Sequence, residues 1–358
     1  MPPASPAVVL PSALAGFAAR FDPHLTGFVR SAAHRSRLGP AAAPLADGLL
    51  RLLLAGGKRL RPALVALGFR AGQQLSGCVG GREAAWLPAA MATELVHAFA
   101  LIQDDVMDGA HRRRGVRWPV AVPGPRGRRV LGRRLLLADL AFVLADLAFE
   151  EGAAAGPRQA EARRTFGLLR LEAVCGQAED LRLSAPAARR AGGALTPAAA
   201  ARAAALKTGL YTAWRPFQLG AALAGPVEQW QPALRAYALP LGIAFQLTDD
   251  LLDLQGDPAR TGKAALGDLR EGKPTHVLAT ALHRLDPEGR RRLSRLLRSG
   301  AWAEAAAVIT ATGAPAATLD LARKLVTRSR AAVGALPLSR QLAGDLDGLA
   351  LWVLARDH

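Results

Sequence analysis

The sequence predicts an all-α protein, and three observations support that prediction. Hydrophobic residues make up 51% of the 358 residues, but aromatic residues make up only 5%. Ala, Leu, Arg and Gly dominate and β-branched residues are scarce, which favours helices over sheets. Apolar residues recur at helical spacing in segments separated by Pro and Gly, and no run alternates like a strand. The length permits one large helical domain or two smaller ones.

The expected helices follow one another along the chain, with Pro and Gly at their ends. They cover residues up to 37, 41–54, 60–74, 83–107, 133–151, 158–183, 196–224 and 226–254, and further helical patterns follow residue 273. Thr196-Pro197 is typical of a helix start, with Thr as the N-cap and Pro at the first helical position. The stretch 109–129, rich in Arg, Gly and Pro, is expected to lack regular structure, and residues 1–10 to form a disordered start.

The formal net charge of +17 attracts phosphates in bulk and raises the question of a nucleic-acid partner. Only five of the 46 basic residues are Lys and Asn is absent, so the charge reflects biased residue usage, and we expect no nucleic-acid partner. Cys78 and Cys175 form neither a metal-binding pattern nor a disulfide framework, which predicts two buried thiols in a reducing cytoplasm. The longest apolar segment, 135–149, falls short of the roughly 20 residues that span a bilayer, so no transmembrane segment is expected.

The first acidic run, Asp104, Asp105 and Asp108, ends the expected helix 83–107. On a helix, Asp104 and Asp108 lie one turn apart on one face, where their like charges repel unless a cation lies between them. His97 and Glu94 continue this face towards the N-terminus at helical spacing. A polar stripe in an otherwise apolar helix indicates a function.

The second acidic run repeats this spacing about 145 residues later, at Asp249, Asp250 and Asp253. Six carboxylates without a His or Cys cluster suit a hard cation with oxygen ligands, Mg²⁺ in particular, which keeps several waters and shares them with substrate phosphates. One such run alone also fits a solvated acidic turn. The pair favours a metal site.

Basic residues accompany both runs. Gly56-Gly57 joins a turn to a helix start, where backbone N–H groups and the helix dipole favour an anion that Lys58 and Arg61 can both reach. The other basic residues at the motifs are Arg113, Arg114, Lys207, Lys263 and Lys273. Taken singly, each fits an ordinary surface position. Together they indicate two phosphorylated substrates, one held through metals and one by direct ion pairs.

These motifs, in this order, resemble the trans-type isoprenyl diphosphate synthases, also called polyprenyl synthetases, over residues 51–275. The matching elements are the aspartate-rich motifs 104–108 and 246–253, the GGKxxRP element 56–62, His97 seven residues before the first motif, Arg113-Arg114, and the pair Lys207-Thr208. The resemblance implies a single domain over 1–358, a bundle of long helices around a deep central cavity, usually in a homodimer. It also implies the substrates isopentenyl diphosphate and an allylic diphosphate.

The resemblance assigns roles residue by residue. Up to three Mg²⁺ ions are bound by Asp104, Asp105, Asp108, Asp249, Asp250 and Asp253, which with Lys207 are the expected catalytic residues. The allylic diphosphate is assigned to Arg113, Lys207, Thr208, Gln246 and Lys263, with Lys273 near the allylic end. Isopentenyl diphosphate is assigned to Lys58, Arg61, His97 and Arg114. The implied reaction is a head-to-tail condensation through an allylic carbocation.

Product length depends on the depth of the cavity below the first motif. Phe99 and Ala100, the fifth and fourth residues before Asp104, resemble the geranylgeranyl diphosphate type, in which one aromatic residue acts as a floor. Phe99 as ordinary core is the other interpretation, and a farnesyl or longer-chain synthase is the alternative product class.

Two other activities use related features. A class I terpene cyclase shares the acidic helix and Mg²⁺ but needs no isopentenyl site, which leaves Lys58, Arg61 and His97 unexplained. A non-catalytic subunit of a heteromeric prenyltransferase would be expected to lack aspartates from one motif. Three departures from the family pattern are Gln103, where His is common, Trp118 after the Arg pair, and Leu266, where Gly is more usual before Asp268.

Overall fold

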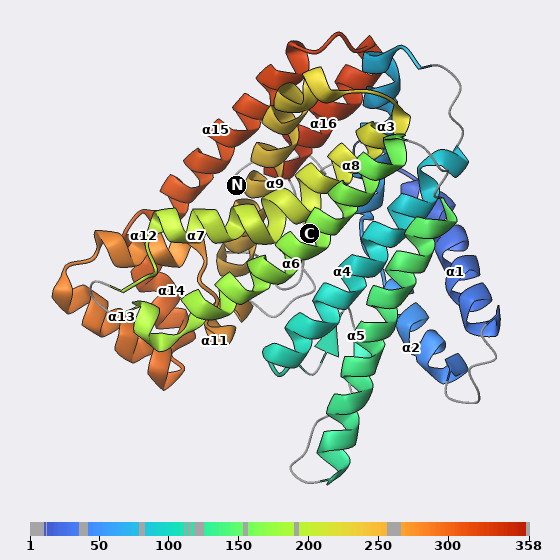
Figure 1. The fold of residues 1–358 in the computed structure, drawn as a ribbon. Helices are drawn as coiled ribbons and strands as arrows, with labels where there is room; N and C mark the ends of the chain where they lie inside the picture. The colour runs from blue at the N-terminus through green and yellow to red at the C-terminus, as the bar shows by residue number, and fades with distance from the viewer. Residues whose placement is uncertain are drawn as a thin grey trace, which may run out of the picture. The chain divides into compact units, whose positions relative to one another are not determined.

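The computed structural model describes residues 11, 13–35, 42–78, 83–110, 112–113, 116–117, 125–152, 157–189, 193–255 and 266–355. These residues are almost entirely helical (Figure 1), which confirms the all-α prediction. They form two compact units: an N-terminal unit, Ser12–Arg170 with Pro216–Glu228, and a C-terminal unit, chiefly Leu171–Arg215 with Gln229–His358. A single domain around a deep cavity stays a prediction. The expected disordered start, 1–10, lies outside the described residues.

The N-terminal unit contains the first acidic run and the glycine turn. Its elements are α1 (Phe17–Arg35), α2 (Ala42–Leu54), α3 (Leu60–Ser76), the 3₁₀ turn η1 (Glu83–Ala85), α4 (Leu87–Met107), β1 (Arg112–Arg113), β2 (Val116–Arg117), α5 (Pro125–Glu151), residues 157–170 of α6 (Pro157–Ser184) and 216–224 of α8 (Arg215–Ala224). α4 and α5 pack side by side (Figure 1). α3 and α8 meet backbone to backbone, because a Cβ on Gly220 would lie 1.9 Å from the carbonyl oxygen of Val65.

The stretch 109–129 differs from its prediction. Two short strands pair antiparallel there, with Arg113 opposite Val116, and α5 begins at Pro125 instead of residue 133. Proline has its φ preset for the first helical position and needs no N–H donor there, so it starts this helix and does not break it. The Arg residues that follow are good helix formers, which extends α5 into the segment expected to be irregular.

The C-terminal unit contains the second acidic run. Its elements are residues 171–184 of α6, the 3₁₀ turn η2 (Pro186–Arg189), α7 (Pro197–Ala204), the π-helix η3 (Ala205–Trp214), α9 (Gln231–Gln255), α11 (Gly267–Glu271), α12 (His276–Arg284), α13 (Pro287–Ser299), α14 (Trp302–Ala311), α15 (Ala314–Gly334) and α16 (Arg340–Ala355); a further 3₁₀ turn, η4 (Glu228–Trp230), precedes α9. α9 packs along α15 and η3. Thr196 caps α7 by accepting the N–H of Ala199 at 3.1 Å, as predicted.

The expected helix 196–224 is interrupted by a π-helical segment, η3, that carries Lys207 and Thr208. Glycines bring its neighbours close: a Cβ on Gly242 of α9 would lie 2.8 Å from the Cα of Gly209, and a Cβ on Gly176 of α6 would lie 2.9 Å from the Cα of Lys207. π-helical turns inside helices occur often at functional sites.

Two further expectations concern cysteines and membrane spans. Cys175 is exposed and Cys78 is half-buried, so the prediction of two buried thiols is wrong. Cys175 lies on the same face of α6 as Leu171 and Val174, which are themselves 58% and 50% exposed, so the whole face is exposed. Within the described ranges no single helix combines the length and apolar character of a membrane span, and α14 with α15 meets those criteria only as a pair bent by 65°.

Candidate functional site

The first acidic run occupies the last turn of α4, which ends at Met107 with Asp108 as its C-cap and Gly109 in the left-handed region at φ 65°. Asp104 and Asp108 are half-buried, whereas Asp105 is 1% exposed. Asp105 lies near Arg134 of α5: burial lowers the pKa of Arg134, and the Asp105 charge opposes that shift. Among the three carboxylates, the geometry therefore favours Asp104 and Asp108 as outward-facing ligands.

The second run, on α9, repeats this arrangement. Asp250 is 5% exposed and accepts hydrogen bonds from the Gln246 Nε2 at 2.7 Å and the His276 backbone N–H at 3.3 Å. Burial, together with the charges of Asp268 and Asp249, raises the pKa of Asp250 well above its ordinary value, although those hydrogen bonds oppose the shift. Asp249 and Asp253 are half-buried. In each motif the middle carboxylate is held inside its own unit and the outer pair is more accessible.

Asp268, on α11, lies beside the second acidic run. From the sequence it was named only to locate Leu266, and no role was predicted for it. Its backbone N–H donates to the Oδ2 of Asp253 at 2.9 Å. Burial raises the pKa of Asp268 to about 7; Asp253 and Asp249 raise it as well, and Lys273 opposes them. In the sequence, the feature that could have identified Asp268 is its position five residues before Lys273.

This acidic cluster fits a divalent cation. Burial and the charge of Asp249 raise the pKa values of both Asp250 and Asp268, and Asp253 adds to the shift of Asp268, which Lys273 opposes. All the donor atoms of these four side chains are oxygens. In the part of the chain that the structure describes, no three His, Cys, Asp or Glu residues form a group that could hold a metal ion by themselves. Coordination by one or two carboxylates, completed by water and substrate phosphate, is characteristic of Mg²⁺.

Thr208 is connected to this cluster through side chains, and its neighbour Lys207 pairs with a different carboxylate. The Thr208 hydroxyl donates to the Oε1 of Gln246 at 2.6 Å, and Gln246 in turn donates to Asp250. The Lys207 Nζ forms an ion pair with the Oδ2 of Asp180 on α6 at 2.8 Å. Asp180 was missed from sequence, where its only signal is a position one turn after Gly176 on the same helix face.

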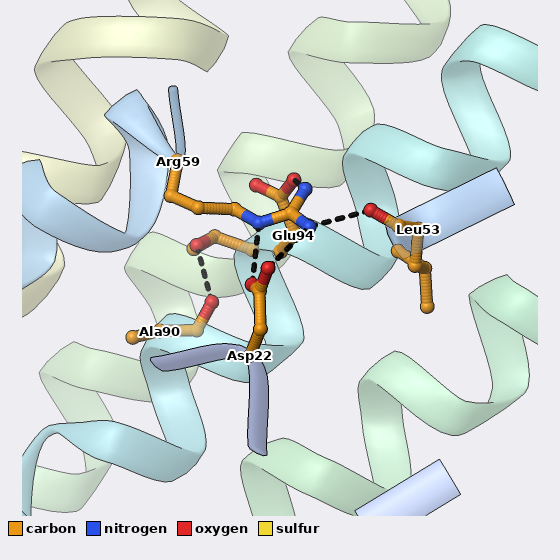
Figure 2. A network of polar contacts seen from close by, with 6 residues as sticks. Asp22, Leu53, Arg59, Ala90 and Glu94 are labelled. Atoms are coloured by element: carbon orange, nitrogen blue, oxygen red, sulfur yellow. Dashed lines mark hydrogen bonds and ion pairs between the residues drawn. The ribbon is translucent and has the colours of Figure 1, made fainter. Parts of the chain in front are cut away.

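The glycine turn before α3 has an unusual backbone. Gly56 and Gly57 have φ of 105° and 137°, values that favour glycine, and Arg59 has φ 50°. The Arg59 side chain is 2% exposed and contacts Asp22, Glu94 and the carbonyl of Leu53 (Figure 2). These contacts bring the turn to α4 one helical turn before His97. Arg59 was missed from sequence, where it is the third cation in Lys58-Arg59-Leu60-Arg61.

The structure describes some of the other predicted site residues fully, one as backbone only, and some not at all. Lys58, Arg61 and His97 are half-buried in the N-terminal unit. Arg113 is described only as backbone in β1, and Arg114, Trp118 and Lys263 lie outside the described residues. Lys273 contacts Glu271 at 2.5 Å and Asp268 at 3.7 Å.

The departures at Gln103 and Leu266 lie within the described residues. Gln103 is half-buried on α4. Leu266 has φ 64°, in the left-handed region, which explains physically why glycine is the more usual residue there.

Phe99, the predicted floor, is 9% exposed on α4. Its ring centroid lies 4.7 Å from that of Phe142 on α5, and the Arg170 guanidinium lies 5.4 Å from the Phe142 centroid. Ala100 is half-buried beside it. An aromatic pair from two helices therefore occupies the position one turn and a half before Asp104.

Comparisons with known proteins agree with these motifs. Residues 44–311 match the sequence profile of the polyprenyl synthetase family. The chain is 31% identical over 261 residues to a short chain isoprenyl diphosphate synthase of Methanocaldococcus jannaschii, covering 69% of this chain and 68% of that one. It is also 31% identical over 312 residues to a geranylfarnesyl diphosphate synthase of Aeropyrum pernix, covering 82% and 88%.

A solved structure shows the same fold. The geranylgeranyl pyrophosphate synthase of Corynebacterium glutamicum, in complex with isoprenyl diphosphate and magnesium, superposes with a TM-score of 0.85 at 30% identity. The match covers 95% of this chain and 99% of that one.

Proposed function

Because the chain belongs to the polyprenyl synthetase family, we propose that it joins isopentenyl diphosphate head to tail to an allylic diphosphate and releases an all-trans prenyl diphosphate and diphosphate. The protein is a prenyltransferase. The observation that carries the proposal is the hydrogen-bonded chain from Thr208 through Gln246 to Asp250. It joins a diphosphate-binding pair to a metal-binding motif, as the departure of a metal-bound diphosphate requires.

The residues of the chain supply electrostatic stabilisation and positioning. Lys207, Thr208 and Gln246, with Arg113 and Lys263, hold the allylic diphosphate while its C–O bond breaks and the bonding pair leaves with the diphosphate. Lys58, Arg61, His97 and Arg114 hold isopentenyl diphosphate so that its double bond attacks the allylic cation and forms the new C–C bond. The proton lost from the isopentenyl unit passes to the released diphosphate.

The aspartates of both motifs would hold up to three Mg²⁺ ions together with the allylic diphosphate. When bound, Mg²⁺ neutralises the negative charge that develops on the leaving diphosphate. Asp104, Asp108, Asp249 and Asp253 are the better placed ligands because they are the more accessible pair of each motif. Asp105 and Asp250 hold the two motifs in place from inside.

Geranylgeranyl diphosphate is the product we propose. The contact between Phe99 and Phe142 supports this assignment. Two packed aromatic rings from neighbouring helices would block a growing prenyl chain more rigidly than one ring. The small side chain of Ala100 would leave room for the prenyl chain above these two rings. A farnesyl or longer-chain product is the alternative, since the relatives named above differ in the product that their names give.

A homodimer in the cytoplasm completes the proposal. On α5, Leu136, Val143 and Leu147 lie at helical spacing and are 57%, 55% and 50% exposed. A continuous apolar stripe of this kind marks a protein interface in a chain without a single membrane-spanning helix among its described residues.

One assay separates the candidate activities. Purified protein is incubated with Mg²⁺, isopentenyl diphosphate and, in turn, dimethylallyl, geranyl and farnesyl diphosphate, and the products are separated by chromatography. Prenyl diphosphate formed only when both substrates are present supports the synthase. A hydrocarbon formed from the allylic substrate alone indicates a terpene cyclase, and no product without a second protein indicates a non-catalytic subunit.

A further inference from the structure

Three cations lie within four residues at the glycine turn, and one of them points inwards. Lys58 and Arg61 are half-buried, whereas Arg59 is 2% exposed. The Arg59 Nε and Nη2 donate to the two carboxylate oxygens of Asp22 on α1, at 2.7 and 3.1 Å. Its Nη1 donates to Glu94 on α4 at 2.8 Å, and its Nη2 to the carbonyl of Leu53, the penultimate residue of α2, at 2.5 Å. We call these four groups the Arg59 cluster (Figure 2).

The charges of the cluster exclude Arg59 as a substrate ligand. Two carboxylates face one guanidinium, so its positive charge is already more than balanced inside the protein. Burial alone lowers the pKa of Arg59, but the hydrogen bonds and charges of Asp22 and Glu94 outweigh it and the net shift is upwards. The guanidinium thus stays charged and bound to α1, α2 and α4.

The backbone of the turn needs an external restraint. Arg59 is the N-cap of α3 with φ 50° and ψ 39°, a conformation that costs a side-chain-bearing residue free energy and persists only where surrounding contacts over-determine it. Its carbonyl nevertheless accepts the N–H of Ala63 at 3.0 Å and starts the helix. The buried side chain provides the restraint, because it connects this one residue to three other helices.

We propose that Arg59 is a positioning residue for the isopentenyl diphosphate site, and that the Arg59 cluster holds Lys58 and Arg61 in the geometry that binds this second diphosphate. This inference rests on the proposed function of the site. Lys58 precedes the restrained residue directly and Arg61 lies in the first turn of α3, so a change in the φ of Arg59 redirects one relative to the other. Glu94 lies one turn before His97, so the same cluster sets the position of the turn relative to that side chain as well.

The first test uses Asp22→Asn, the mildest change to the cluster. The Asp22 side chain is 27% exposed on α1, and the Asn variant keeps the shape and one acceptor oxygen but removes the charge. Isopentenyl diphosphate is titrated into the full-length protein by calorimetry without Mg²⁺, because a site built from direct ion pairs needs no metal. We expect the Kd to rise about threefold to tenfold, which corresponds to the net contribution of one ordinary hydrogen bond.

Steady-state kinetics then separate positioning from general damage. In Asp22→Asn and Glu94→Gln, the KM for isopentenyl diphosphate rises by the same factor as its Kd, whereas the KM for the allylic diphosphate and kcat at saturating isopentenyl diphosphate stay within about twofold. Arg59→Lys keeps the charge but loses the planar fork, so its Kd rises further, about tenfold or more. A change confined to one substrate is not expected from a structural role alone.

Two variants serve as matched controls. Asp47→Asn removes the same charge from an exposed position on α2, and Val29→Ala loosens α1 at a fully buried position without touching Arg59. Both keep the wild-type Kd for isopentenyl diphosphate, although Val29→Ala lowers Tm. If Asp22→Asn and Glu94→Gln lower Tm like Val29→Ala and also keep the wild-type Kd, the positioning role is wrong. If the wild type itself binds no isopentenyl diphosphate and forms no product, the proposed function fails, and this inference fails with it.

Discussion

The Thr208 hydroxyl donates a hydrogen bond of 2.6 Å to the side-chain oxygen of Gln246, 38 residues further along the chain. Thr208 lies on the π-helix η3 and Gln246 on α9, where Gly242, one turn earlier, lets the two helices approach. Gln246 uses its amide N–H on Asp250, so its orientation is set from both ends. The hydroxyl that we propose binds substrate and the motif that we propose binds metal are thereby held as one unit.

Removing this hydroxyl weakens the binding of the allylic substrate. In Thr208→Val, Gln246 loses one of its two restraints and its part-buried side-chain oxygen loses a donor, which costs about 1–1.5 kcal/mol. We expect kcat/KM for the allylic diphosphate to fall about tenfold or more, with little change in the KM for isopentenyl diphosphate, measured by a radiometric assay. Thr327→Val on α15, an exposed position whose hydroxyl donates to the Arg323 carbonyl, is the control and keeps wild-type kinetics.

We expect both acidic runs to be required for turnover. Asp104→Ala and Asp249→Ala each remove a half-buried carboxylate, and we expect each to lower kcat by orders of magnitude, since several kcal/mol of transition-state stabilisation depend on the metals. The helical circular dichroism is unchanged in both. Asp320→Ala, an exposed acidic residue on α15, retains wild-type turnover. A near-normal rate in either motif variant would contradict the mechanism in which the two clusters act together.

We expect the aromatic pair of Phe99 and Phe142 to limit product length. Phe99→Ala removes one ring of the pair and Phe142→Ala the other, so each variant extends the distribution of products towards longer chains in reversed-phase chromatography. Each also loses about 3–5 kcal/mol of stability as a large-to-small change in a packed region. Phe149 and Phe166 stack at 4.6 Å elsewhere in the same unit, and Phe149→Leu should leave the products unchanged. Wild-type products from Phe99→Ala would show that Phe99 is ordinary core.

We expect the apolar stripe of α5 to mediate dimerisation. Val143→Glu places a charge at a position that is 55% exposed in one chain and is expected to be buried between two. The variant should elute as a monomer in size-exclusion chromatography with light scattering, because an unpaired buried charge is strongly unfavourable. Val174→Glu on α6, also exposed, tests whether that helix takes part in the same interface. A dimer in both variants would exclude these faces.

Tyr237 connects α9 to α16 and makes stability depend on alkaline pH. Its hydroxyl donates to the Leu346 carbonyl at 3.1 Å in a fully buried position, so Tyr237→Phe costs about 1 kcal/mol of unfolding free energy at pH 7. Burial, with a further contribution from Asp347, raises the pKa of Tyr237 above the ordinary value of 10.0. Above pH 10 the unfolded chain releases this proton and the folded chain keeps it, so the wild type loses about 1.4 kcal/mol per pH unit from this group. The difference between wild type and Tyr237→Phe in urea unfolding should therefore shrink above pH 10, and a constant difference would contradict this account.

The features that could be predicted from the sequence are those that depend only on residues close together in the chain. Helix existence followed from apolar spacing and from Pro and Gly, and the N-cap at Thr196 followed from side-chain chemistry that needs no distant partner. The start of α5 at Pro125 was missed because a Pro-rich segment fits both a loop and a first helical turn. The exposure of Cys175 was missed because residue type predicts burial, whereas the exposure of a helix face depends on tertiary packing.

By itself, the sequence determined the all-α class, the two acidic runs and the cations that accompany them, because these are properties of residue type and spacing. The tertiary structure decided which carboxylate of each run is buried and which pair is accessible, since burial depends on the helices that pack alongside. It alone brought Asp268 to Asp253, Thr208 to Gln246, and Arg59 to Asp22 and Glu94. Each of these contacts joins residues 15 to 38 positions apart, a separation at which spacing along the chain no longer determines proximity in space.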